Sequence, residues 1–249
     1  MTNVVNAVDS GRSRSTSDIS PRFALGMAVA MLLVNLIGFA PTFYLRAGFS
    51  VAPIPGYLYA HGILGTAWFV FVIMQARLIT VRNVALHRQL GWIGVSLAVM
   101  ELALGYYTSS HMVSRHAAIA PLTEADIRLF GIVAGADLAG FIIIPGLLAC
   151  AIAYRHRMDI HMRLMLLVTL GMLGPANARI AAWFGEIPNP AIGIIVLSFI
   201  GAIVVHDLRT LRRVHKATLF GVLFYFGVLG TVMVTKAGVA IVAQRVSNL

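Results

Sequence analysis

The sequence predicts an all-α integral membrane bundle of about seven transmembrane helices, with a cytoplasmic N-terminus and the C-terminus outside. Three observations support this prediction. The 249 residues are 59% hydrophobic and only 11% charged, with a mean hydropathy of +0.87, whereas soluble domains are about a quarter charged. Apolar stretches of about 20 residues follow one another with short loops between them. Lys and Arg gather in alternate loops, as they do on the cytoplasmic side of membrane proteins.

The chain divides into a polar tail and one membrane domain. Residues 1–20 are rich in Ser, Asn and Asp and carry Arg12 and Arg14, a composition typical of a disordered cytoplasmic tail. No small-residue cleavage site precedes the first apolar stretch, so we do not interpret the tail as a signal peptide. Residues 21–249 are then expected to form a single seven-helix transmembrane domain.

Seven apolar stretches have, or nearly have, the length that crosses a bilayer. In the loop before the fourth stretch, Thr123 and Asp126 have the spacing of a helix capping box. The fifth stretch is interrupted by Pro175, which predicts a kink that opens this helix. The sixth stretch is the shortest. In order, the seven are residues 23–44, 57–79, 90–108, 129–154, 161–184, 191–205 and 217–242.

Positive charges predict the orientation. Thirteen of the 19 Lys and Arg residues fall in the tail or in segments on its side of the membrane, and Arg179 and Lys236 lie inside spans. This asymmetry indicates a cytoplasmic N-terminus, which in a bacterium means the inner membrane. It also explains the net charge of +10 through anionic lipid headgroups rather than nucleic acid. The four remaining residues, on the opposite side, are Arg46, Arg115, Arg128 and Arg245.

Five ionisable side chains are expected in the outer third of the bilayer, each on a different span. Isolated charges at this depth cost on the order of 2.5–3.5 kcal/mol each, so they should converge on one another or on water. With Asn177, they predict an outward-facing chamber that binds or transports a small anionic or carbonyl-bearing molecule and includes a proton relay. A structural ion-pair network and a metal site are the alternatives. The five are His61, Glu101, Asp137, Arg179 and Lys236.

The second span carries a polar stripe. His61, Trp68 and Gln75 are spaced seven residues apart, which places them on one face of a helix. We expect this face to point into the bundle and the aliphatic faces to point to lipid. Elsewhere, Gly131 and Gly135 have the small-x3-small spacing of close helix contacts, within the bundle or in a homo-oligomer.

Histidines form a second group at the cytoplasmic edge. They lie at span ends or in loops, and several adjoin Arg or Lys, a composition typical of an anchor for anionic headgroups. Imidazole is also a common metal ligand. Four histidines can hold one zinc or iron, and two can hold one haem. The candidates are His87, His161, His206 and His215, with His156 as the fifth member of the group.

Three stretches resemble a recurrent type of small bacterial multi-pass inner-membrane protein of uncharacterised function. They are HGILGTAWFVFVIMQARL at residues 61–78, LHRQLGWIG at residues 86–94 and HMRLMLLVTLGMLGPANAR at residues 161–179. The resemblance implies a fold type and not an activity.

Three further families share some of the spans, histidines or in-span charges of this sequence. Cytochrome b561-type proteins pair histidines at both membrane faces, whereas here only the inner face has several candidates, which fits one inner haem. Ceramidase- and progestin-receptor-type proteins share seven spans and the orientation, but their Ser-x3-His and His-x3-His zinc motifs are absent. Retinal proteins such as the heliorhodopsins need a lysine in the seventh span and a carboxylate in the third. Lys236 and Glu101 fit those spans, but Lys236 is too near the outer end for a mid-membrane Schiff base.

The sequence therefore leaves three functions open. The first is a binding or transport protein that uses the outer chamber. The second is a haem- or metal-dependent membrane redox protein that uses the cytoplasmic-edge histidines. The third is an accessory or structural subunit of a larger membrane complex.

Overall fold

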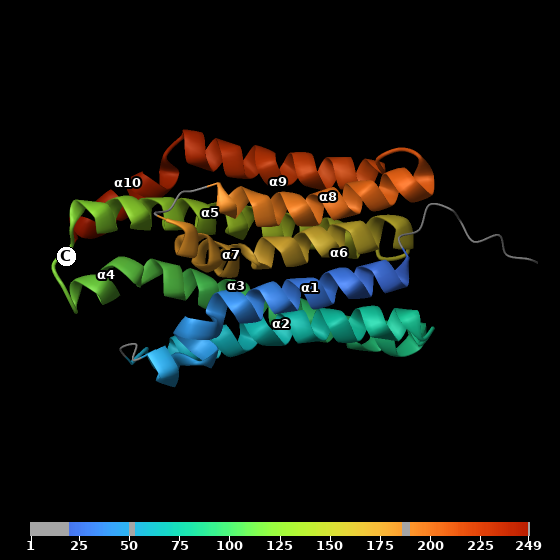
Figure 1. The fold of residues 1–249 in the computed structure, drawn as a ribbon, viewed down its shortest axis with the longest axis horizontal. Coiled ribbons are helices and arrows are strands. Elements are labelled where there is room, and N and C mark those ends of the chain that lie inside the picture. Colours follow the sequence, from blue (N-terminus) through green and yellow to red (C-terminus); the bar gives the residue numbers. More distant parts are fainter. Residues whose placement is uncertain (1–19, 50–52, 186–189, 249) are drawn as a thin grey trace, which may run out of the picture.

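The computed structural model describes residues 20–49, 53–185 and 190–248. The tail predicted for residues 1–20 lies outside these ranges except for Ser20. All regular structure in the described residues is helical, which confirms the all-α prediction (Figure 1). The elements are α1 (Pro21–Phe39), the π-helical turn η1 (Ala40–Tyr44), the 3-10 turn η2 (Arg46–Phe49), α2 (Gly56–Thr80), α3 (Val84–Ser110), α4 (Met112–Ala117), α5 (Glu124–Ala153), α6 (Met158–Met172), α7 (Gly174–Ala181), the 3-10 turn η3 (Ala182–Phe184), α8 (Ala191–Leu211), α9 (Lys216–Val234) and α10 (Ala237–Val246).

Six helices are long and apolar enough to cross a membrane, and the bent pair of α6 and α7 makes up to seven when it is counted as one span. The chain is therefore a multi-pass membrane protein. The first five predicted spans correspond to helices at the expected places. The helix α8 extends past the predicted residue 205 to Leu211, so the sixth span is longer than the hydropathy alone indicated.

The helices pack side by side along one axis (Figure 1). The long helix α5 contacts α6, α9 and α10, while α2 lies between α1 and α3. The start of α1 and the turns α2–α3, α5–α6 and α8–α9 share one end of the bundle, which the charge pattern predicts to be cytoplasmic. The core contains Met31, Trp68, Leu147 and Leu167, each almost fully buried.

The fifth span is broken where the sequence predicts a kink. Helix α6 ends at Met172, and α7 begins at Gly174 with its axis bent by 49°. Pro175 lies in the first turn of α7, where its missing N–H costs nothing and its ring prevents the α6 hydrogen bonds from continuing. Gly38 of α1 lies against the backbone of Ala176, so α1 approaches the broken segment closely.

The seventh span differs from the prediction of one helix over 217–242. Helix α9 ends at Val234, and Lys236 adopts a left-handed conformation with φ of 52° before α10 begins. This turn brings α10 against α5, with Gly238 facing Gly131 and Gly135. A Cβ atom at Gly238 would collide with the α5 backbone. The α5 glycines therefore contact another helix of the same bundle, as one of the two sequence interpretations expected.

The predicted capping box at the start of the fourth span is confirmed. The hydroxyl of Thr123 accepts a hydrogen bond from the Asp126 N–H at 3.1 Å, and Asp126 Oδ2 accepts one from the Thr123 N–H at 3.0 Å. These two bonds satisfy donors that a helix start otherwise leaves free, and they fix residue 124 as the first of α5.

Candidate functional site

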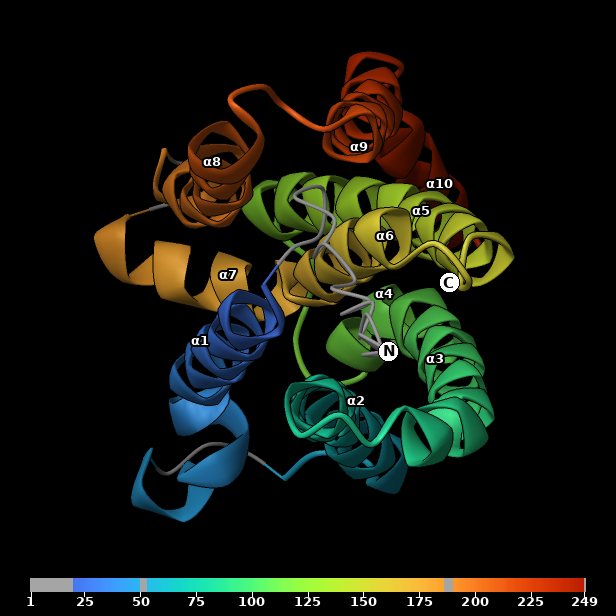
Figure 2. The ribbon, with the colours of Figure 1, turned by 90° about the vertical axis from the view of Figure 1, so that its right-hand side faces the viewer.

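A cavity of about 400 Å³ lies within the bundle at its predicted cytoplasmic end. Residues of α1, α2, α3, α5 and α6 line it, and these helices surround this end in Figure 2. Its wall contains the rings of Trp68, Phe71 and Trp92 and the flexible side chains of Met162 and Met165. The volume and the mostly apolar lining are typical of a site for a cofactor or another organic ligand.

His87 of α3 and His161 of α6 meet at this cavity. Their ring centroids are 6.4 Å apart, and the ring planes lie at 83° to each other. His161 Nδ1 is 2.8 Å from the carbonyl oxygen of Ala151. Because a carbonyl can only accept, Nδ1 carries the hydrogen and Nε2 keeps its lone pair. A neutral histidine oriented by a backbone carbonyl in this way is prepared to bind a metal.

Several polar atoms around the cavity have no protein partner. Trp68 Nε1, both amide atoms of Gln75 and His87 Nδ1 are buried and form no hydrogen bond with any described residue. All three residues line the cavity, and Trp68 and Gln75 belong to the stripe predicted on the second span. Buried polar groups in folded proteins are nearly always paired. These atoms therefore indicate that the cavity accommodates water or a polar ligand.

The rim of the cavity at the predicted cytoplasmic end is basic. Arg88, Arg155 and His156 contribute to its lining, and all three side chains are exposed. Such a rim suits a ligand with carboxylate groups at its outer edge, since arginine pairs with carboxylates through two parallel hydrogen bonds.

The structure does not bring the four candidate histidines His87, His161, His206 and His215 together at the cavity. His206 stacks on Phe23, with 4.3 Å between ring centroids, and His215 caps α9 by accepting a hydrogen bond from the Ala217 N–H at 3.1 Å. Helices α8 and α9 pack outside α6 and contribute nothing to the cavity lining (Figure 2). Within the described ranges, no group of three or more His, Cys, Asp or Glu residues is placed to hold a metal ion.

A buried ion pair closes the same end of the bundle, and the sequence interpretation missed it. Arg163 of α6 donates to Asp207 of α8 from Nε at 3.0 Å and from Nη2 at 2.6 Å, and neither side chain is exposed. The second oxygen of Asp207 accepts from the His215 N–H at 3.0 Å and from the Thr218 hydroxyl at 2.6 Å. The sixth span was predicted to end at residue 205, so Asp207 was not expected inside a helix and its need for a partner was not recognised.

His215 lies beside this pair, between α8 and α9. Its Nε2 is 3.4 Å from Asp159 Oδ2, and its side chain is mostly buried. Burial, followed by the charge of Arg163, lowers the pKa of His215 below its ordinary value of 6.5. The neutral ring is therefore the form that fits the α9 cap, because only a neutral Nδ1 can accept the Ala217 N–H.

In the outer half, the structure brings His61 of α2 and Glu101 of α3 together. His61 Nδ1 lies 3.1 Å from Glu101 Oε1, with side-chain exposures of 27% and 12%. The contact has the distance of an ion pair but not the direction of a hydrogen bond, and Glu101 Oε2 has no partner among the described residues. Gly65 and Gly105 face these two side chains and leave room for them.

Asp137 and Arg179 complete this outer group without touching each other. Asp137 of α5 lies within electrostatic reach of His61, Arg179 and Arg245 and within hydrogen-bonding reach of Ser109. Arg179 of α7 is exposed, donates to the Pro175 carbonyl at 3.1 Å and places its guanidinium 4.3 Å from the ring centroid of Phe39. Among the described residues, neither Asp137 nor Arg179 forms a salt bridge.

Two residues predicted to line the outer chamber, Lys236 and Asn177, lie elsewhere in the structure. Lys236 is exposed at the turn between α9 and α10, because the left-handed residue ends α9 there. It shares no contact with the other predicted residues and offers no buried amine for a Schiff base. Asn177 is buried in α7, where its Nδ2 donates to the Ile192 carbonyl at 2.8 Å and links α7 to the start of α8.

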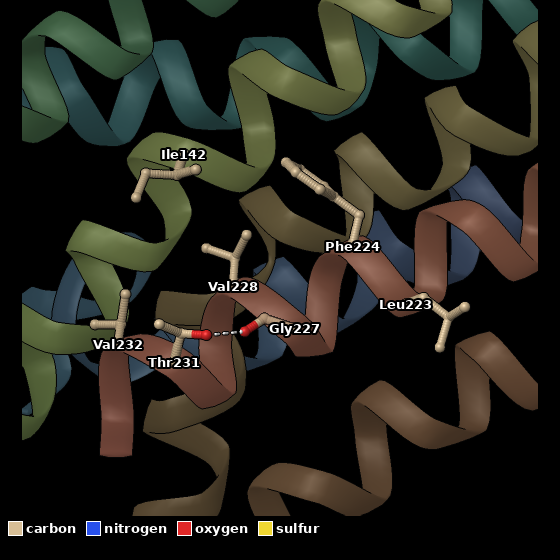
Figure 3. Close-up of a pocket in the computed structure, with 7 residues that line it drawn as sticks. All are labelled: Ile142, Leu223, Phe224, Gly227, Val228, Thr231 and Val232. Carbon is tan, nitrogen blue, oxygen red and sulfur yellow. Dashed lines mark hydrogen bonds between the residues drawn. The ribbon is translucent and has the colours of Figure 1, made fainter. Parts of the chain in front are cut away.

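A second hollow, of about 410 Å³, lies between α5 and α9 (Figure 3). Ile142, Leu223, Phe224, Val228 and Val232 make it apolar, and the Thr231 hydroxyl is occupied by the Gly227 carbonyl at 2.8 Å. No titratable side chain lines it. This groove fits the lipid-facing surface of a membrane protein and offers no groups for chemistry.

Comparisons of the chain with models of protein families, with curated proteins and with solved structures find no match. The assignment of function therefore depends on the geometry of the inner cavity and of the outer group.

Proposed function

We propose that this protein is a haem-binding redox protein of the bacterial inner membrane, with His87 and His161 as the two axial ligands of one haem at the cytoplasmic end. The observation on which the proposal depends is the neighbouring pair of imidazoles at the edge of a cavity of about 400 Å³. A metal bound by two histidine nitrogens at about 2.0–2.1 Å each places the ring centroids on its two sides about 6 Å apart. The observed 6.4 Å agrees with this spacing.

The donor set favours haem over a bare metal ion. Two imidazoles alone are too few for a structural zinc, which needs four ligands. No third protein ligand accompanies them in the described residues. A haem supplies four nitrogens of its own and needs only two axial histidines. The flat rings of Trp68, Phe71 and Trp92 suit the faces of a porphyrin, and Arg88 and Arg155 suit its carboxylates.

The surrounding residues would determine the reactivity of the haem. His87 and His161 would hold the haem, and a haem held by two histidines would supply electron transfer rather than binding of a substrate at the metal. The Ala151 carbonyl would orient the His161 ring through Nδ1 and increase its basicity. The apolar wall would keep water away from the iron.

Absorption spectroscopy of the detergent-purified protein, oxidised and reduced, with iron analysis of the same sample, tests the proposal. We expect a Soret band that shifts on reduction and one iron per chain. His87→Ala and His161→Ala should each lose the bound haem. His206→Ala is the matched control and should keep it, because His206 stacks on Phe23 away from the cavity.

Other outcomes would exclude the proposal. The spacing of His87 and His161 also suits an edge-to-face contact between two neutral rings. A colourless, iron-free protein that cannot be loaded with haem would support that simpler explanation. A stable partner protein after gentle solubilisation, with no cofactor of its own, would support an accessory subunit instead.

A further inference from the structure

The outer group consists of His61, Glu101, Asp137 and Arg179, from four different helices. We propose that it binds a neutral molecule that carries both a carbonyl and a hydroxyl group, of the quinone and quinol class. The proposal does not depend on a haem in the inner cavity, because the two regions have no residue in common.

The charges of the group argue against an anion. The sequence alone suggested two cations, Arg179 and Lys236, facing two carboxylates. Since Lys236 is exposed at the α9–α10 turn, the two arginines within electrostatic reach of Asp137 are Arg179 and Arg245. The neighbouring Arg245 donates to the Ser109 carbonyl at 2.6 Å. An anionic ligand would therefore meet two carboxylates and no surplus of positive charge, whereas a neutral polar ligand would meet no such repulsion.

The polar groups around Asp137 lie near one another without direct salt bridges, which leaves a role for a bridging molecule. Asp137 lies near enough to His61 and Arg179 to interact electrostatically, yet it forms no salt bridge within the described residues. Charged groups inside a span are costly unless they pair directly or through a polar bridge. Arg179 is exposed, and His61 is 27% exposed at its side chain, so a ligand can reach both.

The donors and acceptors match the proposed ligand class. The Arg179 guanidinium can donate to a carbonyl, which has no hydrogen to offer. Glu101 Oε2 has no partner among the described residues and can accept from a hydroxyl. Aromatic rings adjoin both ends of the group, with Phe39 against Arg179 and Phe141 near the Gly105 position that faces His61. These rings can pack against a flat headgroup.

The membrane location favours the same class. A ligand that reaches a site inside a bundle from the bilayer has to be largely apolar and uncharged, because a charge in the hydrocarbon layer is expensive. A quinone headgroup on an apolar tail meets this condition, and a free carboxylate does not.

Isothermal titration calorimetry with a short-chain decyl-substituted para-benzoquinone tests the inference on the full-length protein in detergent. We expect saturable binding that weakens about tenfold or more in Arg179→Gln and in Glu101→Gln, since each loses a charge-assisted hydrogen bond. Lys236→Gln is the matched control and should bind as the unchanged protein does. His87→Ala should also bind the quinone, which separates this test from that of the haem.

Three results would overturn the inference. The first is no quinone binding by the folded, unchanged protein. The second is equal binding by Arg179→Gln and the unchanged protein. The third is binding of benzoate, a simple carboxylate, in place of the quinone, which would make the group an anion site. If Arg179→Gln does not fold, Arg179→Lys keeps the charge. It should bind more weakly than the unchanged protein, because an ammonium lacks the guanidinium fork.

Discussion

The two ends of the bundle differ in how completely their charged side chains are paired. At the predicted cytoplasmic end, Arg163 and Asp207 are fully buried, and both oxygens of Asp207 accept hydrogen bonds. In the outer half, Asp137 and Arg179 interact only at a distance, and one oxygen of Glu101 has no partner in the part of the chain that the structure describes.

This difference distinguishes polar groups whose hydrogen bonds are complete from polar groups that are only partly paired. A buried pair whose hydrogen bonds are complete has little left to offer a ligand, and its removal mainly affects folding. Polar groups that gather without complete pairing are costly to the fold, so their presence is better explained by a bound molecule. At the inner cavity, polar atoms of Trp68, Gln75 and His87 likewise have no hydrogen-bond partner among the described residues, which supports the proposal that this cavity binds a ligand.

The largest effect is expected from a comparison of the two aspartates. Asp207→Ala leaves Arg163 buried without its carboxylate, which should cost about 3–5 kcal/mol of unfolding free energy. Asp137→Ala should cost about 1 kcal/mol or less, because Asp137 forms no salt bridge in the described residues. Denaturation in mixed micelles measures both values. Equal losses would show that the outer group is as structural as the inner one.

An intermediate effect is expected at the contact between α5 and α10. This contact holds Arg245 of α10 within electrostatic reach of Asp137. Gly238→Ala adds a methyl group that overlaps the α5 backbone, and overpacking of this kind costs about 1–3 kcal/mol. Gly230→Ala is the control, because its Cβ would meet nothing within 4 Å. Thermal denaturation in detergent should show a lower Tm for the first variant only. A matching decrease in both would contradict the close contact.

The smallest effect is a dependence of stability on pH at the predicted cytoplasmic end. Because burial and Arg163 lower the pKa of His215, the folded protein takes up a proton there less readily than the unfolded chain. The resulting stability is complete above the unfolded pKa of 6.5 and is lost as the pH falls through the lower folded pKa.

Replacement of His215 isolates this contribution. His215→Asn can still cap α9 through its side-chain oxygen but cannot take up a proton. The decrease in Tm between about pH 8 and about pH 5 should be smaller in the variant than in the unchanged protein. The same decrease in both would assign the pH dependence to other groups.

Several features of the inner cavity and the outer group could be predicted from the sequence. The stripe of Trp68 and Gln75 and the kink at Pro175 follow from helical spacing and hydropathy. His87 and His161 were two of four candidate histidines, which the sequence placed at span ends on one side of the membrane. The cost of leaving a charge alone in a span predicted that the in-span ionisable groups would meet, but not that His61 would pair with Glu101. In contrast, nothing in the spacing showed that His206 and His215 point away from the cavity.

The sequence by itself determined the fold class and the approximate positions of the first six spans, because hydropathy and helix signals are local properties of the chain. Only the tertiary structure decided which polar groups meet. The rotation of each helix about its axis is determined by packing with its neighbours, as in the pairing of Arg163 with Asp207. One left-handed residue at Lys236 was enough to end α9, remove this lysine from the outer group and turn α10 against α5.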